Sequence, residues 1–181
     1  LKAEGKRSDF TPNWVHVVGA GAMGGDIAAW CALQGLRVSL QDQAPEAIGQ
    51  ALARARKLFE RKLKDPRLVR ATADRLMPDH RGVGLARADL VIEAVFEDAE
   101  VKRELFRRLE SRVRPDCLLA SNTSTIPLQE IARDLADPGR LVGLHFFNPV
   151  ASMQLVEVVS AEATAPQAAA RGASFARGIG R

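Results

Sequence analysis

Three side chains in the last third of the sequence could together carry out acid–base chemistry. They are the hydroxyl of Ser124, the imidazole of His145 and the carboxylate of Glu157. A histidine exchanges protons near neutral pH, because its ordinary pKa is about 6.5. A carboxylate beside it can orient the ring and stabilise its cationic form. Glu157 stands in the otherwise apolar run 155–159, where it needs either a partner or an exposed edge strand. The pattern therefore suggests a Ser–His–Glu site and leaves open that Glu157 only faces solvent.

A glycine-rich loop precedes these residues and points to a dinucleotide. Gly19, Gly21 and Gly24 follow the apolar run 14–18 and open a helical pattern. In such a loop the first glycine allows the tight turn, the second lets the backbone approach a pyrophosphate, and the third lets helix and strand pack closely. Asp42 ends the next predicted strand, where a carboxylate can bind both ribose hydroxyls and repel a 2′-phosphate. The motif predicts NAD rather than NADP; a glycine turn without a ligand is the less favoured alternative.

Strand and helix patterns alternate along the chain and indicate the scaffold. We expect strands at 14–18, 37–42, 89–95, 118–120, 141–146 and 155–159, and helices at 24–33, 45–64, 66–76, 98–112, from about 127, and at 165–177. This alternation predicts an α/β fold of the Rossmann type, a doubly wound, mostly parallel sheet with helices on both faces. Ser124 and His145 would follow strands at the carboxyl edge, where open α/β sheets bind ligands.

Composition restricts the function classes. The chain has 181 residues, of which 46% are apolar and 27% charged, as expected for one globular domain. No apolar run reaches the roughly 20 residues of a membrane span. The start is polar rather than signal-like, and Cys31 and Cys117 have no metal or redox spacing, so we expect a reducing compartment, the cytoplasm.

The net charge of +4 is mild and its densest cluster lies at 54–64. That cluster is either a solvated helix face or an attraction for an anionic ligand such as a nucleotide phosphate. Nucleic acid is a weaker partner, because aromatic residues make up only 5% of the chain and no known nucleic-acid motif is present.

Several segments together resemble the NAD-binding domain of L-3-hydroxyacyl-CoA dehydrogenases, the enzymes of fatty-acid β-oxidation. The resembling segments are 17–25, 90–97, 121–124, 143–150 and 153–159. The resemblance implies oxidation of L-3-hydroxyacyl-CoA to 3-ketoacyl-CoA with NAD as hydride acceptor. The leading segment 1–12 resembles the linker after the hydratase domain of multifunctional fatty-oxidation proteins. We therefore expect a linker at 1–12 and the NAD-binding domain at 13–181.

The resemblance also implies a role for each matching position. His145 corresponds to the catalytic base, Glu157 to its carboxylate partner, and Ser124 to a serine near the substrate oxygen and the nicotinamide. Met23 and Asp42 correspond to positions that line the adenosine half of NAD. The positions around the ribose and nicotinamide are Val95, Phe96, Glu97, Lys102 and Asn148.

The family continues into a helical domain that closes over the substrate and carries most of the dimer contact. Because that domain is absent from this sequence, we expect NAD binding with poor turnover, and oligomerisation only in a longer parent chain. Lys62 or Lys64 could meet a CoA phosphate. Two alternatives remain open: a dehydrogenase for a different hydroxy acid, and a non-catalytic nucleotide-sensing module, since a fold does not fix a function.

Overall fold

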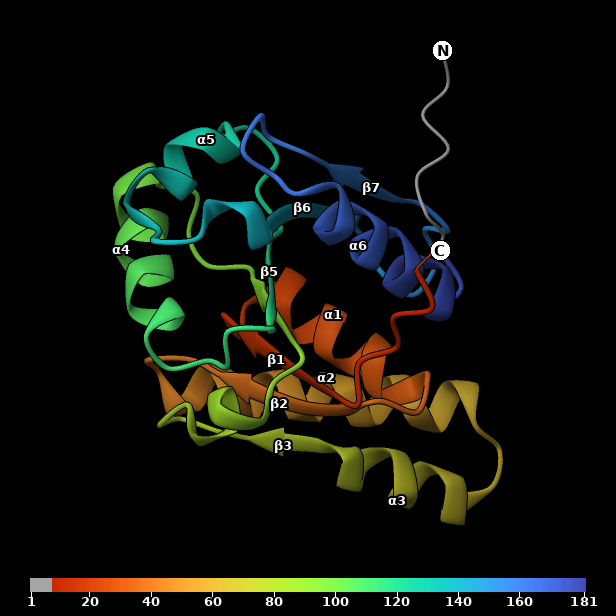
Figure 1. Ribbon diagram of the computed structural model, residues 1–181. Coiled ribbons are helices and arrows are strands. Elements are labelled where there is room, and N and C mark those ends of the chain that lie inside the picture. Colours follow the sequence, from red (N-terminus) through yellow and green to blue (C-terminus); the bar gives the residue numbers. More distant parts are fainter. Residues whose placement is uncertain (1–7) are drawn as a thin grey trace.

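The structure is a computed structural model that describes residues 8–181 and contains one mixed sheet (Figure 1). The strands are β1 Trp14–Val18, β2 Arg37–Gln41, β3 Leu76–Pro78, β4 Leu90–Glu93, β5 Leu118–Ser121, β6 Leu141–Phe146 and β7 Val156–Val159. The helices are α1 Ala22–Leu33, α2 Pro45–Lys62, α3 Pro66–Arg75, α4 Ala99–Glu110, α5 Leu128–Ile131 and α6 Pro166–Gly178. Short 3-10 turns lie at Val83–Arg87, Ala132–Asp134 and Pro138–Arg140.

The sheet has seven strands in the order β3-β2-β1-β4-β5-β6-β7. All neighbouring pairs are parallel except β6 and β7, which run antiparallel. The strand order reverses between β1 and β4, and in open α/β sheets ligands bind outside the carboxyl ends of the strands at such a reversal. The predicted Rossmann-type, mostly parallel fold is confirmed.

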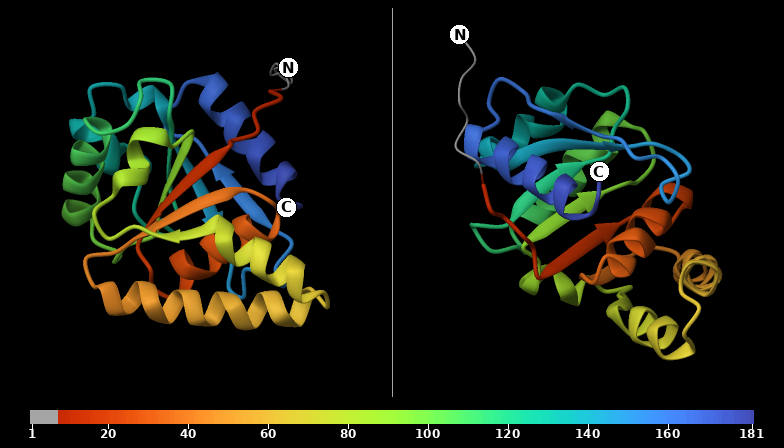
Figure 2. Two further views of the ribbon diagram at one scale, coloured as in Figure 1. Left: turned by 90° about the horizontal axis from the view of Figure 1, so that it is seen from below. Right: turned by 90° about the vertical axis from the view of Figure 1, so that its right-hand side faces the viewer.

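Helices cover both faces of the sheet, as the two views of Figure 2 show. One apolar core joins the sheet to α1, α2 and α6, with Ile27, Phe59 and Phe175 almost fully buried. The other joins it to α4 and α5 through Phe106 and Ile131. Burial on both faces explains why the strand sequences read as continuous apolar runs rather than as alternating ones.

The element boundaries differ from the sequence-based prediction in small but physical ways. The helix predicted at 66–76 ends at Arg75, and the next three residues form the edge strand β3, which was not predicted. A strand of three residues that ends in proline carries almost no periodic signal, and an edge position tolerates the missing N–H. The strand predicted at 118–120 runs on to Ser121, so Ser124 lies in the loop beyond β5.

The end of the predicted linker is attached to the domain. Residues 1–7 lie outside the described part of the chain, so the linker prediction for them has no structural counterpart here. The carbonyl of Phe10 accepts a hydrogen bond from Ser174 Oγ at 2.9 Å, and the Arg171 guanidinium lies 4.2 Å from the Phe10 ring centroid. Both partners are in α6. Within residues 8–181, no helix combines the length and apolar character that a membrane crossing requires.

Candidate active site at the carboxyl edge of the sheet

The three glycines of the loop between β1 and α1 differ in whether the fold has room for a side chain at their positions. Gly19 has φ +103°, and a Cβ there would lie 2.5 Å from Ala94 O. A Cβ on Gly24 would lie only 1.7 Å from Gly19 O. Gly21 is different, because a Cβ there would meet no atom within 4 Å. The fold itself therefore requires glycine at two positions, whereas the third leaves open space above the loop.

That open space adjoins the N-terminus of α1. Gly21 is the N-cap residue of this helix, no side chain caps it, and the first turn contains no acidic residue. The first N–H groups of a helix point outward with a partial positive charge, so an uncapped end favours an anion such as a pyrophosphate. Arg54 of α2 donates a hydrogen bond to Gly21 O at 3.1 Å and adds a cation beside the loop.

Two hollows flank the loop. The first, which we call the Asp42 cavity, has a volume of about 580 Å³ and is lined by Asp42, Val95, Phe96 and apolar residues of α4. Asp42 Oδ2 accepts from Ala20 N at 2.7 Å and Oδ1 from Ala44 N at 2.9 Å. These two bonds fix the carboxylate at the rim of the cavity and leave further lone pairs for ribose hydroxyls.

The second hollow, the His145 cavity, has a volume of about 520 Å³. It shares Gly21, Ala94, Val95 and Phe96 with the Asp42 cavity. Its lining also includes five further predicted cofactor positions, which are Met23, Glu97, Lys102, Ser124 and Asn148. Met23 lines this cavity and not the Asp42 cavity, and its assignment to the adenosine half of NAD stays a prediction. The two hollows meet at Gly21, and an extended dinucleotide can pass from one to the other with its pyrophosphate at the helix end.

His145 and Glu157 form a pair across the antiparallel strands β6 and β7. The two residues are in register, and His145 Nδ1 lies 3.1 Å from Glu157 Oε2. Because a carboxylate only accepts hydrogen bonds, Nδ1 carries the proton and Nε2 is left as the basic nitrogen. The Phe147 ring packs against the imidazole with 4.4 Å between centroids. The side chains of His145 and Glu157 are 22% and 52% exposed, so both readings of Glu157 hold at once: it lies on an edge strand and it also has a partner.

A buried group of charges next to this pair was not predicted as a unit. Glu93, at the end of β4, and Lys102, in α4, are 0% and 1% exposed, with 2.5 Å between Oε1 and Nζ. Lys102 also lies 3.2 Å from Glu97. A carboxylate at the end of an otherwise apolar strand, followed by a lysine nine residues later, was the available signal in the sequence. Charged residues are almost never fully buried unless they are paired.

Glu97 connects this group to the loop that carries Ser124. Its Oε1 accepts from Thr123 Oγ1 at 2.5 Å, from Ser124 N at 3.1 Å and from Thr125 N at 3.2 Å. Burial raises the pKa of Glu97, but the hydrogen bond from Thr123 and the charge of Lys102 outweigh it and lower the pKa to about 2. Glu97 is therefore a fixed negative charge in the wall of the His145 cavity.

Comparison with known proteins places this geometry in a family. The family model described as the NAD-binding domain of 3-hydroxyacyl-CoA dehydrogenase matches residues 14–181. The chain belongs to this dehydrogenase domain family. The glycine loop, Asp42 and the His145 cavity all lie within the matched range, and NAD is the cofactor of the domain.

Solved structures agree with this assignment. The chain is similar to 3-hydroxybutyryl-CoA dehydrogenase from Escherichia coli K12, with 37% identity, a TM-score of 0.91, and coverage of 95% of this chain and 37% of that one. For FadB2 from M. tuberculosis the values are 40%, 0.87, 92% and 60%. For the dehydrogenase part of multifunctional enzyme 1 from C. elegans they are 31%, 0.84, 94% and 40%. The dehydrogenase domain thus spans less than two thirds of each of these longer chains.

The other two histidines of the dehydrogenase domain, His16 and His80, lie outside the His145 cavity. His16 is fully buried in β1, with Nδ1 2.6 Å from Ser39 Oγ and Nε2 2.9 Å from Gln41 Oε1. Burial lowers the pKa of His16. His80 is exposed, and its Nδ1 lies 3.0 Å from the backbone oxygen of Asp42. Cys31 and Cys117 are buried thiols whose pKa burial raises to about 12, and they behave as small apolar residues.

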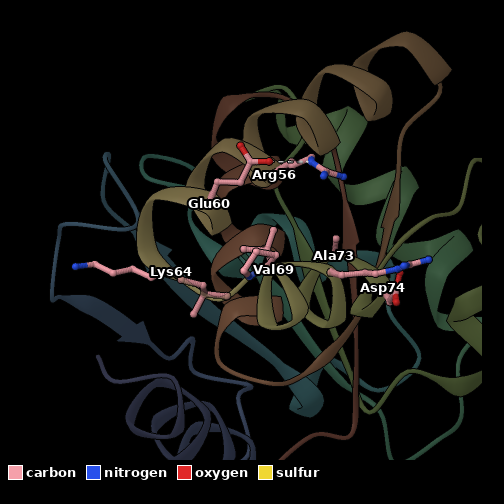
Figure 3. Close-up of a pocket in the computed structure, with 9 residues that line it drawn as sticks. Arg56, Glu60, Lys64, Val69, Ala73 and Asp74 are labelled. Atoms are coloured by element: carbon pink, nitrogen blue, oxygen red, sulfur yellow. Dashed lines mark hydrogen bonds and ion pairs between the residues drawn. The ribbon is translucent and has the colours of Figure 1, made fainter.

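The basic segment 54–64 does not form a single cationic face. Arg54 points to the glycine loop, whereas Arg56 and Lys64 line a groove of about 610 Å³ between α2 and α3 (Figure 3). Glu60 and Asp74 line the same groove, and Glu60 pairs with Arg56 at 3.0 Å. The groove shares no lining residue with the Asp42 cavity or the His145 cavity. Most of the charge on this segment is therefore solvated or locally compensated.

Proposed function

We propose that the chain forms the cofactor half of an enzyme that interconverts L-3-hydroxyacyl-CoA and 3-ketoacyl-CoA with NAD. The observation that carries the proposal is the His145–Glu157 pair at the wall of a cavity that continues to the glycine loop. A cofactor site alone would suit many functions. A histidine base within the same cavity supplies the group that oxidation of an alcohol requires.

The chemistry balances with these groups. Nε2 of His145 accepts the proton of the 3-hydroxyl as the C3–H bond breaks and the C–O bond becomes a carbonyl. Bound NAD would supply the acceptor for the hydride that leaves C3. The positive charge that develops on the imidazole lies next to Glu157 and is stabilised by it. In the direction of ketone reduction, the imidazolium of His145 returns the proton to oxygen.

Ser124 supplies a second polar contact for the reacting oxygen. It lines the His145 cavity, and its backbone N–H is bonded to Glu97, so the residue is held by its main chain. No residue from 8 to 181 makes a hydrogen bond with the Ser124 hydroxyl, which leaves it able to donate to the substrate oxygen. A donor at that position stabilises the charge that develops on oxygen during hydride transfer.

The CoA thioester, β-oxidation and a place in a multifunctional protein are the finer parts of the proposal. These finer parts are supported by two of the similar structures named above. One is a 3-hydroxybutyryl-CoA dehydrogenase, and the other is the dehydrogenase part of a multifunctional enzyme. Lys62 and Lys64 remain candidates for contact with a CoA phosphate. A further domain would supply the second wall of the acyl site and the oligomer contacts in the longer protein.

Titration of the chain with NADH and NADPH, followed by cofactor fluorescence, tests the cofactor half. We expect clear preference for NADH and weaker binding in Asp42→Ala. The matched control is Asp116→Ala, which removes a 78% exposed carboxylate that, within residues 8–181, pairs with Arg114 at 3.6 Å. Failure of the wild-type chain to bind either cofactor, or a preference for NADPH, would contradict this half of the proposal.

Turnover separates the enzyme from its rivals. Acetoacetyl-CoA and NADH are supplied to the chain and to any longer form of the protein that contains residues 1–181. We expect His145→Gln to lower kcat by about a hundredfold or more while the Kd of NADH stays within about threefold. NADH binding without turnover in every form would indicate a nucleotide-sensing module. Turnover of a free hydroxy acid that CoA does not inhibit would indicate the other dehydrogenase class.

A further inference from the structure

Lys102 is an unusual residue, because a lysine side chain is rarely enclosed in a protein core. Its side chain is 1% exposed, and its ammonium lies 2.5 Å from Glu93 Oε1 and 3.2 Å from Glu97 Oε2. The ammonium also donates to Val95 O at 3.3 Å. One buried cation therefore lies between two carboxylates, one buried and one partly exposed.

Glu93 is the inner end of this chain of charges. Besides Lys102, its Oε1 accepts from Val95 N at 2.7 Å, and its Oε2 accepts from Ser121 Oγ at 2.6 Å. The Ser121 hydroxyl oxygen in turn accepts from Thr123 N at 3.2 Å. Glu93 thus connects the ends of β4 and β5 to each other and to α4.

Glu97 is the outer end, and its contacts are concentrated on one short segment. The hydroxyl of Thr123 and the N–H groups of Ser124 and Thr125 all donate to the same oxygen, Oε1, while Oε2 is the atom that faces Lys102. The Glu97 carboxylate is therefore oriented by Lys102 on one side, and on the other side it accepts hydrogen bonds from the Ser124 loop, residues 123–125.

We propose that Glu93 is a positioning residue for Ser124 and acts through Lys102 and Glu97. It holds the ammonium in the one place from which the ammonium can orient the Glu97 carboxylate toward the Ser124 loop. The catalytic meaning of this positioning rests on the function proposed above, whereas the ordering of the loop does not. Glu93 touches neither substrate nor cofactor, since it lines neither cavity.

The physical argument is one of geometry rather than stability. Buried ion pairs seldom stabilise a protein more than apolar packing of the same volume, because desolvation offsets their attraction. What a buried, fully hydrogen-bonded charge does provide is a fixed direction, because each bond constrains the next. A donor that must meet a developing charge in the transition state depends on such precision of placement.

The test compares three variants of the chain by NMR and thermal unfolding. Glu93→Gln keeps the size of the side chain and removes its charge. Glu93→Gln/Lys102→Met removes the buried cation as well, so that no unpaired ammonium remains in the core. Glu110→Gln is the control, because its carboxylate also accepts two loop N–H groups, from Ala136 and Asp137, both at 2.9 Å, and these residues do not line the His145 cavity.

We expect Glu93→Gln to lower the melting temperature and to accelerate amide hydrogen exchange at Ser124 and Thr125 by about tenfold or more. Their amide proton shifts should move as the bond to Glu97 weakens. The double variant should regain most of the melting temperature while the exchange at Ser124 and Thr125 stays fast, because the Lys102 ammonium that orients Glu97 is now gone. Glu110→Gln should lower the melting temperature without changing either amide.

Two results would overturn the proposal. One is exchange at Ser124 and Thr125 within about twofold of wild type in Glu93→Gln. The other is a double variant in which melting temperature and loop exchange recover together, as a purely structural role predicts. The NADH titration of the wild-type chain tests the proposed function independently. If the wild-type chain does not bind NADH, the proposed function is refuted, while the exchange data still decide whether Glu93 orders the loop.

Discussion

The contrast between Gly21 and Gly24 gives the sharpest prediction of the cofactor site. Gly21→Ala adds a Cβ that meets no atom within 4 Å, at a residue with φ −67° and ψ −167°, which any amino acid adopts. Alanine is a poorer N-cap than glycine, but it also reduces the entropy of the unfolded chain, and the two effects are each below about 1 kcal/mol and opposed. The free energy of unfolding should therefore change by no more than about 0.5 kcal/mol.

The same methyl group stands where the pyrophosphate would approach the loop. We expect the affinity for NADH to fall by about tenfold to a hundredfold, which corresponds to about 1.4 to 2.8 kcal/mol. Gly24→Ala is the matched change in the same loop. Its Cβ would lie 1.7 Å from Gly19 O, so backbone must move, and overpacking of this kind costs about 1 to 3 kcal/mol or more of stability.

Thermal unfolding and NADH fluorescence titration of the two variants decide the matter. The predicted pattern is a stable Gly21→Ala that binds weakly and a destabilised Gly24→Ala. A Gly21→Ala chain that melts like wild type and binds NADH within twofold of wild type would refute the reasoning, because the open space at Gly21 would then have no part in cofactor binding. Equal destabilisation of both variants would refute the inference that Gly24 is required by the fold and Gly21 by the cofactor.

Three further predictions concern charge. Asp42→Asn should weaken NADH binding by about tenfold and narrow the preference over NADPH, measured by paired titrations, because the ribose loses a charged acceptor. The pKa of Glu97 in the fold, about 2, lies below its ordinary 4.5, so the unfolded chain binds more protons between these values and stability falls as the pH drops through them. Without solvent screening, this pKa shift would correspond to about 3.4 kcal/mol of unfolding free energy. Because the Glu97 side chain is 36% exposed, we expect about half of that value. In Glu97→Gln, the melting temperature should therefore fall less steeply than in wild type as the pH drops. Burial lowers the pKa of His16, so the unfolded chain is again the better proton acceptor, and stability should decline as the pH falls below 6.5; His16→Gln should remove that part of the decline in thermal melts.

Local sequence signals were sufficient to predict a helix or strand wherever the element was long or was bounded by clear turn residues. The apolar runs that became β1, β4 and β6 are buried on both faces, and the glycine loop marks the turn from β1 to α1. The strand β3 was missed because its pairing with β2 comes from tertiary position, not from a pattern within Leu76–Pro78. The direction of β7 also follows from pairing, since nothing in the residues 156–159 alone distinguishes a parallel from an antiparallel strand.

The same distinction holds for the site. His145 and Glu157 could be proposed as a pair because each stands out in its own segment, and the register of β6 and β7 brings them together. Glu93 also stands out in an apolar strand, yet its partners come from α4 and β5, and only the packed structure shows that Lys102 and Ser121 reach it. A contact between two residues that each stand out in their own segment was predictable, whereas a network shared by three elements was not.

Two acid–base pairs, Glu93–Lys102 and His145–Glu157, differ in solvent exposure, and the difference matches the role proposed for each. Glu93 and Lys102 are enclosed, where charges interact strongly and side chains have one arrangement, so the pair is suited to fixing the Ser124 loop. His145 and Glu157 are 22% and 52% exposed, where water weakens their attraction. Under the proposed function, His145 takes up and releases a proton in each cycle, and it needs such access to solvent between turnovers.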